Sequence, residues 1–347
     1  MPNLTETAHK ARQVIKFGGF GFVGLLFIWL VGSNAIRIWR IVNPAPPPPP
    51  SEDFGSLEPI NFPESKELSY DLQTPTGEIE EFTTQIKVFY SPALRSSFLD
   101  AERATELARS LGFLFEPEHP TEGTLRWQKS SPVSMTLEVE LATTNFTLNK
   151  QWQAAPRLLQ DKRFISDQQS IIDAQSFLRS AGVMKNDLSG NEKVSYFKAS
   201  NNKLTSALSL SEADFVRVDF FRQTYQELDE NDEVVVEHEF YSIEPDQGLA
   251  WVMLSGIRET DLKVIKAEYD YRPIEYDESG VYGLKSAQQA WEELQSGEGY
   301  VARYDGVGTA VIRRVKLGYL EPLEGSEYTK PVYVFTGDDG LIAYVSA

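Results

Sequence analysis

Apolar residues recur at helical spacing in a few segments of the chain and at every second position in many others. Helical spacing predicts three helices, over residues 98–113, 167–183 and 286–297. Asp100 is the predicted N-cap of the first helix, Ser166 or Asp167 that of the second, and Ser286 that of the third, and a glycine closes each one. In the third helix one apolar face is expected to be buried: Ala287, Ala290, Trp291 and Leu294.

Alternation of apolar and polar residues predicts β-strands between and after these helices. Met135, Leu137 and Val139, for example, alternate with polar residues. The predicted strands cover about residues 86–90, 125–128, 135–141, 145–148, 214–227, 233–243, 249–256, 262–275, 309–320, 331–336 and 341–345. Neighbouring strands with few helices between them favour an α+β fold, in which antiparallel sheets are each packed with few helices.

The alternation is interrupted near residues 155–166, which suggests a boundary there. We predict a first α+β module over residues 68–160 and a second α+β region over residues 161–347. Within the second region, residues 280–347 are expected to form a structural module of one helix on a three-stranded antiparallel sheet.

A run of twenty residues without charge, from Phe17 to Ile36, precedes these modules. As a helix it matches the hydrocarbon core of a bilayer, which is about 30 Å thick. We predict a cytoplasmic N-terminus over residues 1–16 and one transmembrane helix over residues 17–42, followed by Asn43-Pro44. The residues expected to anchor the chain are Phe17, Leu25, Leu26, Phe27, Ile28, Trp29 and Leu30, with Trp39 at the interface.

Two alternatives remain for this run. Ser33-Asn34-Ala35 resembles the small-residue site at which a signal peptide is cleaved, and a buried core helix is the second alternative. The basic residues on both sides and the N-terminal position argue against a core helix. The apolar stretch is longer than that of a usual signal peptide, and IRIW continues it beyond the possible cleavage site, which favours an uncleaved anchor. The larger number of basic residues before the run places the N-terminus in the cytoplasm. We therefore expect a single-pass protein of the plasma membrane, with the lipid bilayer as one partner and an extracytoplasmic C-terminal part.

Residues 43–67 are predicted to form a proline-rich linker. The sequence PAPPPPP over residues 44–50 favours a polyproline II rod, and a docking site for a proline-binding domain is the alternative. The part that follows is polar and interrupted by proline. We expect it to lie against the folded part through Phe54, Leu57, Ile60 and Phe62.

Composition narrows the classes of function. The 347 residues include 33 Lys and Arg against 51 Asp and Glu, a net charge of −18, which argues against nucleic acid as a partner. The absence of cysteine excludes disulfides, thiol catalysis and cysteine metal sites. The hydrophobic content of 41% is ample for a core.

The sequence predicts no catalytic, cofactor-binding or metal-ligating residues. His238 lies in a strand pattern in which Glu237 and Glu239 point to the opposite face, and His119 lies in a predicted loop. A G-x-G-x-x-G match at residues 19–24 falls inside the apolar run, without the preceding strand that a dinucleotide site needs.

Acidic and aromatic clusters leave more than one interpretation open. Residues 229–233 read DENDE, which predicts a charged hairpin turn, with calcium binding as the alternative. Asp338-Asp339-Gly340 predicts another turn. Ten of the 15 tyrosines lie between residues 269 and 344, and we expect core and sheet faces there, or alternatively an exposed binding surface.

The last part of the chain resembles a known family. YGLKSAQQAWEEL over residues 282–294 leads to VKLGY at 315–319, PVYVFTG at 331–337 and AYVSA at 343–347. This order resembles the C-terminal module of the YycH/YycI family, which are membrane-anchored extracytoplasmic regulators of a cell-wall sensor kinase. It is also similar in plan to PepSY-like domains, and the proline-rich leader resembles that of single-pass envelope proteins of small-genome bacteria. The resemblance covers about a fifth of the chain and implies an anchored, extracytoplasmic bacterial protein, with a regulatory role by analogy.

These features favour a non-catalytic binding or regulatory protein of the bacterial cell envelope, partnered by another envelope or membrane protein. A carboxylate-dependent envelope hydrolase and a structural component of envelope assembly are the alternatives. A deep cleft that holds two carboxylates about 5–10 Å apart, one of them desolvated, would indicate the hydrolase.

Overall fold

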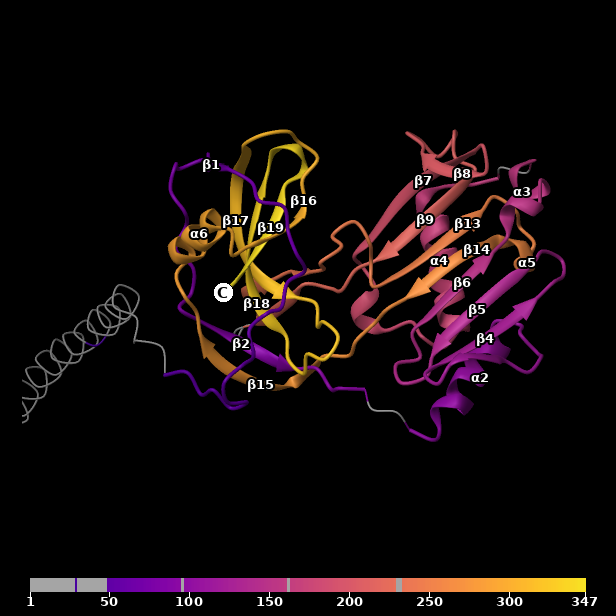
Figure 1. Cartoon of the computed structure of the whole chain (residues 1–347), viewed down its shortest axis with the longest axis horizontal. Helices are drawn as coiled ribbons and strands as arrows, with labels where there is room; N and C mark the ends of the chain where they lie inside the picture. Colours follow the sequence, from indigo (N-terminus) through magenta and orange to yellow (C-terminus); the bar gives the residue numbers. More distant parts are fainter. Residues whose placement is uncertain (1–28, 30–48, 95–96, 161–162, 229–232) are drawn as a thin grey trace, which may run out of the picture. The chain divides into compact units, whose positions relative to one another are not determined.

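The computed structural model describes residue 29 and residues 49–94, 97–160, 163–228 and 233–347. The chain divides into two units, Met1–Pro49 and Pro50–Ala347, and nearly all described residues belong to the second (Figure 1). The predicted membrane anchor therefore lies outside the described residues, apart from Trp29, which is helical and 70% exposed. Within the described ranges, no helix combines the length and the apolar character needed to cross a membrane.

Nine strands form one antiparallel sheet, in the order β3-β4-β5-β6-β14-β13-β9-β7-β8 (Figure 1). Their bounds are β3 (Glu118–Thr121), β4 (Thr124–Lys129), β5 (Met135–Glu140), β6 (Phe146–Lys150), β7 (Glu192–Ser200), β8 (Lys203–Ser206), β9 (Phe215–Phe220), β13 (Ala250–Ser255) and β14 (Val264–Tyr269). Because β6 pairs with β14, strands from both sides of residue 160 share this sheet. The predicted boundary near residues 155–166 thus falls inside one sheet, since alternation along a strand carries no information about its partner.

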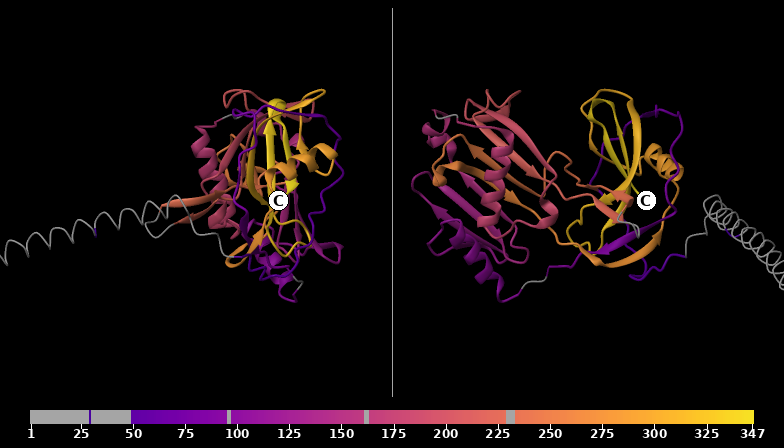
Figure 2. Two further views of the ribbon diagram at one scale, coloured as in Figure 1. Left: turned by 90° about the vertical axis from the view of Figure 1, so that its left-hand side faces the viewer. Right: turned by 180° about the vertical axis from the view of Figure 1, so that it is seen from behind.

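The two faces of this sheet carry separate apolar cores. Helices α2 (Asp100–Ser110) and α4 (Asp167–Ser180) cover one face, where Ala104 and Leu178 pack with strand residues such as Val218. Seen from behind in Figure 2, the α4 ribbon lies in front of the strands. The neighbouring strand residue Phe215 belongs to the core on the other face, together with Trp152 of η1 (Trp152–Ala154). The short helices α3 (Arg157–Gln160) and α5 (Thr260–Lys263) complete that second core.

The three predicted helices are present, with shorter bounds and one different cap. In α4 the predicted cap is confirmed, because the Ser166 hydroxyl accepts the backbone N–H of Gln169 at 3.1 Å. The predicted cap of α2 is wrong. Asp100 is already the first helical residue and Leu99 is the cap, while the Asp100 carboxylate accepts the backbone N–H of Ser97.

A second sheet has the order β1-β17-β18-β19-β16, and β12 also pairs with β17. Its strands are β1 (Tyr70–Leu72), β12 (Phe240–Tyr241), β16 (Tyr300–Arg303), β17 (Ala310–Leu320), β18 (Lys330–Gly337) and β19 (Ile342–Ser346). The pairs among β16, β17, β18 and β19 are antiparallel, as predicted for these sheets. The expected three-stranded module over residues 280–347 contains four strands of this sheet, because β16 has only four residues and gives no clear alternation. The pairs of β1 and β12 with β17 are parallel, which departs from the prediction, because both short strands come from distant parts of the chain.

Helix α6 (Ala287–Ser296) packs on the second sheet. Ser286 and Gln289 form a capping box, and Gly297 ends the helix with a φ of 86°. Trp291 is only 8% exposed, and its ring contacts those of Tyr70 and Phe335 at centroid distances of 6.2 and 6.1 Å. The predicted apolar face is confirmed, since all four of its residues are buried: Ala287, Ala290, Trp291 and Leu294.

Two further strand pairs stand outside both sheets: β2 (Gln85–Tyr90) with β15 (Glu275–Gly283), and β10 (Tyr225–Leu228) with β11 (Val234–His238). Two long predicted strands are therefore each divided. The strand over 214–227 becomes β9 and β10, and the strand over 233–243 becomes β11 and β12. The chain changes partners at each break, which the apolar pattern does not reveal.

The linker beyond residue 50 lies against the folded part, as expected. Phe54 stacks on Tyr328 with ring centroids 4.6 Å apart, and Phe62 stacks on Tyr300 at 5.5 Å. Ile60 packs with Phe62 in an apolar cluster on one face of the second sheet. These contacts make the segment part of the fold.

Candidate functional site

Strand β17 is paired along only part of one of its edges. Its other edge pairs with β18 along almost its whole length. On the first edge, β1 pairs with residues 310–312 and β12 with residues 319–320. On this first edge no described strand pairs with residues 313–318, so the edge has a gap between β1 and β12.

Local sequence explains why the two flanking strands do not meet. The chain turns away after β1 because Pro75 has no N–H with which to continue the pairing, and Gly77, with a φ of 75°, closes the turn that follows. On the other side, β11 ends at His238 and β12 begins only at Phe240.

A groove of about 530 Å³ lies over this gap. Its floor is residues 313–317 of β17, and its walls come from the segments before β2 and around β12. The wall residues are Thr74, Pro75, Glu78, Glu80, Phe82, Glu237, His238, Glu239 and Tyr241. A second hollow of about 580 Å³ shares Thr74, Pro75, Arg313 and Arg314 with the groove and extends it toward Thr336.

Main-chain groups of β17 point into this groove. The N–H groups of Tyr319 and Glu321 donate to carbonyls at the β12 segment, at 2.9 and 2.8 Å. Because backbone polar groups alternate between the two edges of a strand, those of Val315 and Leu317 point to the same edge. They lie in the gap, where no described strand pairs with them.

The side chain of His238 forms a hydrogen bond with one of these main-chain groups. Its Nδ1 lies 3.2 Å from the carbonyl oxygen of Leu317, so the proton of the ring belongs on Nδ1. Burial lowers the pKa of His238, and the ring is therefore neutral at neutral pH. The sequence analysis placed Glu237 and Glu239 on the face opposite His238. Glu237 and His238 are consecutive residues of β11, as that alternation requires, and Glu237 and Glu239 also line a second hollow without His238. All three residues nevertheless line the groove.

The cations on the floor of the groove are not equivalent. Arg313 forms an ion pair with Asp338, and Lys316 forms one with Glu239 at 2.8 Å. Burial alone would raise the pKa of Glu239, but hydrogen bonds from Lys316 and Tyr241 lower it on balance. Arg314 lies between these two cations and forms no ion pair with any described carboxylate. The charge of Arg314 also helps to lower the pKa of Glu239, but no ion pair holds its guanidinium, which leaves it available to a ligand.

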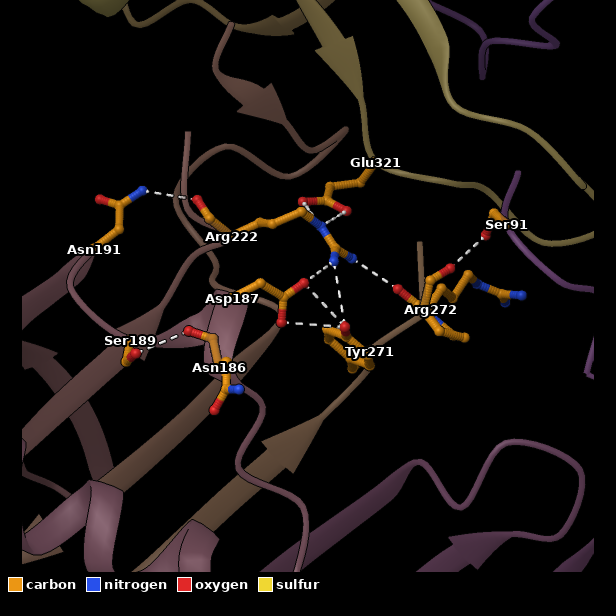
Figure 3. Close-up of polar contacts among 10 residues, drawn as sticks. Ser91, Asn186, Asp187, Ser189, Asn191, Arg222, Tyr271, Arg272 and Glu321 are labelled. Atoms are coloured by element: carbon orange, nitrogen blue, oxygen red, sulfur yellow. Dashed lines mark hydrogen bonds and ion pairs between the residues drawn. The ribbon is translucent and has the colours of Figure 1, made fainter. Parts of the chain in front are cut away.

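A buried cluster around Arg222 joins the nine-stranded sheet to the end of β17 (Figure 3). Arg222 follows β9 and is only 2% exposed. Its Nε donates to both oxygens of Glu321, at 3.1 and 3.0 Å, and its other nitrogens donate to Asp187 and to the carbonyl of Arg272. The hydroxyl of Tyr271 donates to Asp187 at 2.9 Å, and its ring lies against the guanidinium.

This cluster fixes the position of the groove and does not itself offer a binding group. The partners of Arg222 occupy its donors, so the guanidinium cannot also hold a ligand. Phe240 of β12 lies under Arg222, with the guanidinium carbon 5.5 Å from the ring centre. Arg222 therefore holds the strand that limits one end of the gap.

Desolvated carboxyl groups lie away from the groove. Among the described carboxyl groups, burial raises the pKa of Asp219, Asp270 and Glu321. Each has a structural partner, respectively Arg217, Asn145 and Arg222, and none of the three lines the groove. Across the described ranges no three His, Asp or Glu side chains are grouped so that they could hold a metal ion. The acidic residues 229–232 lie outside those ranges.

The sequence analysis missed Arg222 and Arg314. Arg222 did carry a signal, because it directly follows Phe220 and Phe221 within a predicted strand, and a buried charge requires partners. Arg314 carried none, since exposed arginines on strands are common. The tyrosines behaved as the core interpretation predicted: Tyr319, Tyr333 and Tyr344 are fully buried.

A comparison with models of known protein families and with curated proteins finds no match to this chain. The resemblance of the last part to the YycH/YycI family and to PepSY-like domains stays a prediction.

Proposed function

We propose that the chain is a membrane-anchored, non-catalytic binding or regulatory protein of the bacterial cell envelope. The folded unit would lie outside the plasma membrane and engage another envelope or membrane protein through the groove over β17. The observation that carries this proposal is the groove itself, in which an unpaired strand edge and an unpaired guanidinium face the same space of about 530 Å³.

Two further observations support binding over hydrolysis, and a third supports the membrane anchor. In the groove the carboxylate of Glu239 is held in an ion pair with Lys316, and burial does not raise the pKa of Glu239 on balance. The desolvated carboxyl groups, of which Glu321 is one, are engaged elsewhere in the fold. The uncharged run over residues 17–36, continued by IRIW, supports an uncleaved anchor, and its basic flanks support the compartment.

Site-specific photo-crosslinking in intact cells tests the proposal. A photoreactive amino acid at Lys316, on the groove floor, should form an adduct with a partner protein. The same amino acid at Gln128, an exposed position of β4, should form none. Protease added to spheroplasts should degrade the folded unit, and mass spectrometry should find the intact N-terminus. Equal adducts at both positions, or protection of the folded unit from protease, would contradict the proposal.

A further inference from the structure

We infer that the gap in the edge of β17 receives an extended protein segment as an added β-strand, with one carboxylate of that segment on Arg314. This inference rests on the proposed function and names the class of its partner. The gap over residues 313–318 is six residues long, which corresponds to about 20 Å of strand.

The main chain on either side of the gap already forms a ladder that such a segment would continue. Before the gap, the N–H of Gln73 donates to the carbonyl of Ile312 at 2.9 Å. After it, the N–H of Tyr319 donates to the carbonyl of Glu239 at 2.9 Å. A register shift in β17 between Ile312 and Arg314 lets the main-chain groups of both Ile312 and Tyr319 face this edge. An added strand after the shift would pair with Val315 and Leu317 and fill the edge between the two short pairings. The carbonyl of Leu317 can accept a second hydrogen bond beside that of His238, because it has two lone pairs.

The two faces of the gap differ, and this difference defines the side chains of the segment. On one face Leu317 is buried and pairs across the sheet with Tyr333, whose ring contacts that of Phe82. The other face carries Arg314 and Lys316. Because successive side chains of a strand point to opposite faces, the segment should alternate apolar residues with polar ones.

The charges of the groove indicate that one of the polar positions of the added segment is acidic. Lys316 already holds Glu239, and Arg313 holds Asp338, so Arg314 is the cation that a new carboxylate would meet. The other charges that line the groove are Glu78, Glu80 and Glu237. These glutamates disfavour further acidic residues, which limits the segment to a single carboxylate opposite Arg314.

The test uses the full-length chain in detergent and a displayed library of eight-residue segments. We expect the selection to enrich segments that alternate apolar and polar residues and contain one Asp or Glu. A synthetic peptide of the enriched sequence should slow hydrogen exchange at the amides of Val315 and Leu317. N-methylation of the peptide amides that face β17 should weaken binding at least tenfold, whereas N-methylation of the intervening amides should leave it unchanged.

Charge reversal gives a matched pair of variants. Arg314→Glu should weaken the acidic peptide at least tenfold and should prefer the peptide whose acid is replaced by lysine. Arg258→Glu, an exposed charge reversal outside the groove, should change neither affinity. The exchange of preference between peptides excludes misfolding as the cause.

Several outcomes would overturn strand addition. The selection would enrich no alternating segment, or both N-methylated peptides would bind as well as the unmodified peptide. The third such outcome is that two copies of the chain pair with each other through this edge. A crosslink at Lys316 accompanied by any of them would leave the proposed binding function standing and refute only the strand mode. Loss of the crosslink as well would refute both.

Discussion

Arg222 offers a quantitative test of how the two sheets are joined. The substitution Arg222→Met replaces the aliphatic part of the arginine side chain with an unbranched apolar side chain and removes the guanidinium. It leaves Glu321, which is 9% exposed, without its cation, and the carbonyl of Arg272 without its donor. Breaking a buried ion pair costs about 3–5 kcal/mol, and an unpaired buried polar group costs about 1–3 kcal/mol. We expect the free energy of unfolding to fall by about 3–5 kcal/mol, since the two costs overlap.

This loss should depend on pH, with a sign that the structure fixes. Burial raises the pKa of Glu321, and Arg222 opposes that shift. Without Arg222 the folded-state pKa of Glu321 should rise further, whereas the pKa of Glu321 in the unfolded state stays at its ordinary value. Between the two pKa values the folded state holds more protons, so the free energy of unfolding falls as the pH rises. The variant should therefore be less destabilised at pH 5 than at pH 8.

Urea titrations of residues 50–347 at both pH values, followed by tryptophan fluorescence and circular dichroism, measure these changes. The double variant Arg222→Met/Glu321→Leu should recover much of the loss, because an apolar pair can replace a buried ion pair. Arg157→Met, which removes an exposed ion pair with Glu259, should change little. A loss of Arg222→Met no larger than that of Arg157→Met, or one that is equal at both pH values, would refute the reasoning.

Three further predictions concern the rest of the fold. Trp291→Ala should lower the free energy of unfolding by about 3–5 kcal/mol, measured in the same urea titration, because the ring is buried against Tyr70 and Phe335; an unchanged midpoint would contradict its burial. Burial lowers the pKa of Lys150 to about 8 from 10.5, so the unfolded state holds the extra proton between these values. The free energy of unfolding of the wild type should gain a rising contribution across that pH window, and in Lys150→Met that contribution should be absent; identical pH profiles would rule this out. Residues 50–347, expressed without the preceding segment, should be soluble and melt cooperatively in calorimetry, and aggregation would count against an independent unit.

Local features of the fold could be predicted from the sequence, and long-range ones could not. Helix α6 follows from Ser286, Gln289 and Gly297, whose capping roles depend on neighbours within one turn. The strand over residues 309–320 follows from its own alternation, and β17 covers nearly the same residues.

The pairing of these elements required information that alternation does not contain. β1 and β12 are too short to give a pattern, and each pairs parallel to β17 across a large separation in sequence. The groove exists because these two strands leave a gap, so its location depends on two unpredictable pairings. Arg222 and Glu321 likewise meet only once both sheets are formed.

The pairing of Tyr70 with Ala310 has a consequence for the order in which the chain folds. At a synthesis rate of about 5–20 residues per second, the partner strand β17 is synthesised on the order of 10–50 s after β1. The consecutive strands β3 to β6 need no such delay, because each pairs with its neighbour in sequence. During this interval Phe54 and Phe62, whose partners Tyr328 and Tyr300 are also made late, stay unpaired. The second sheet is therefore a late product of synthesis, and its early segments depend on their own charges and prolines to remain free of aggregation.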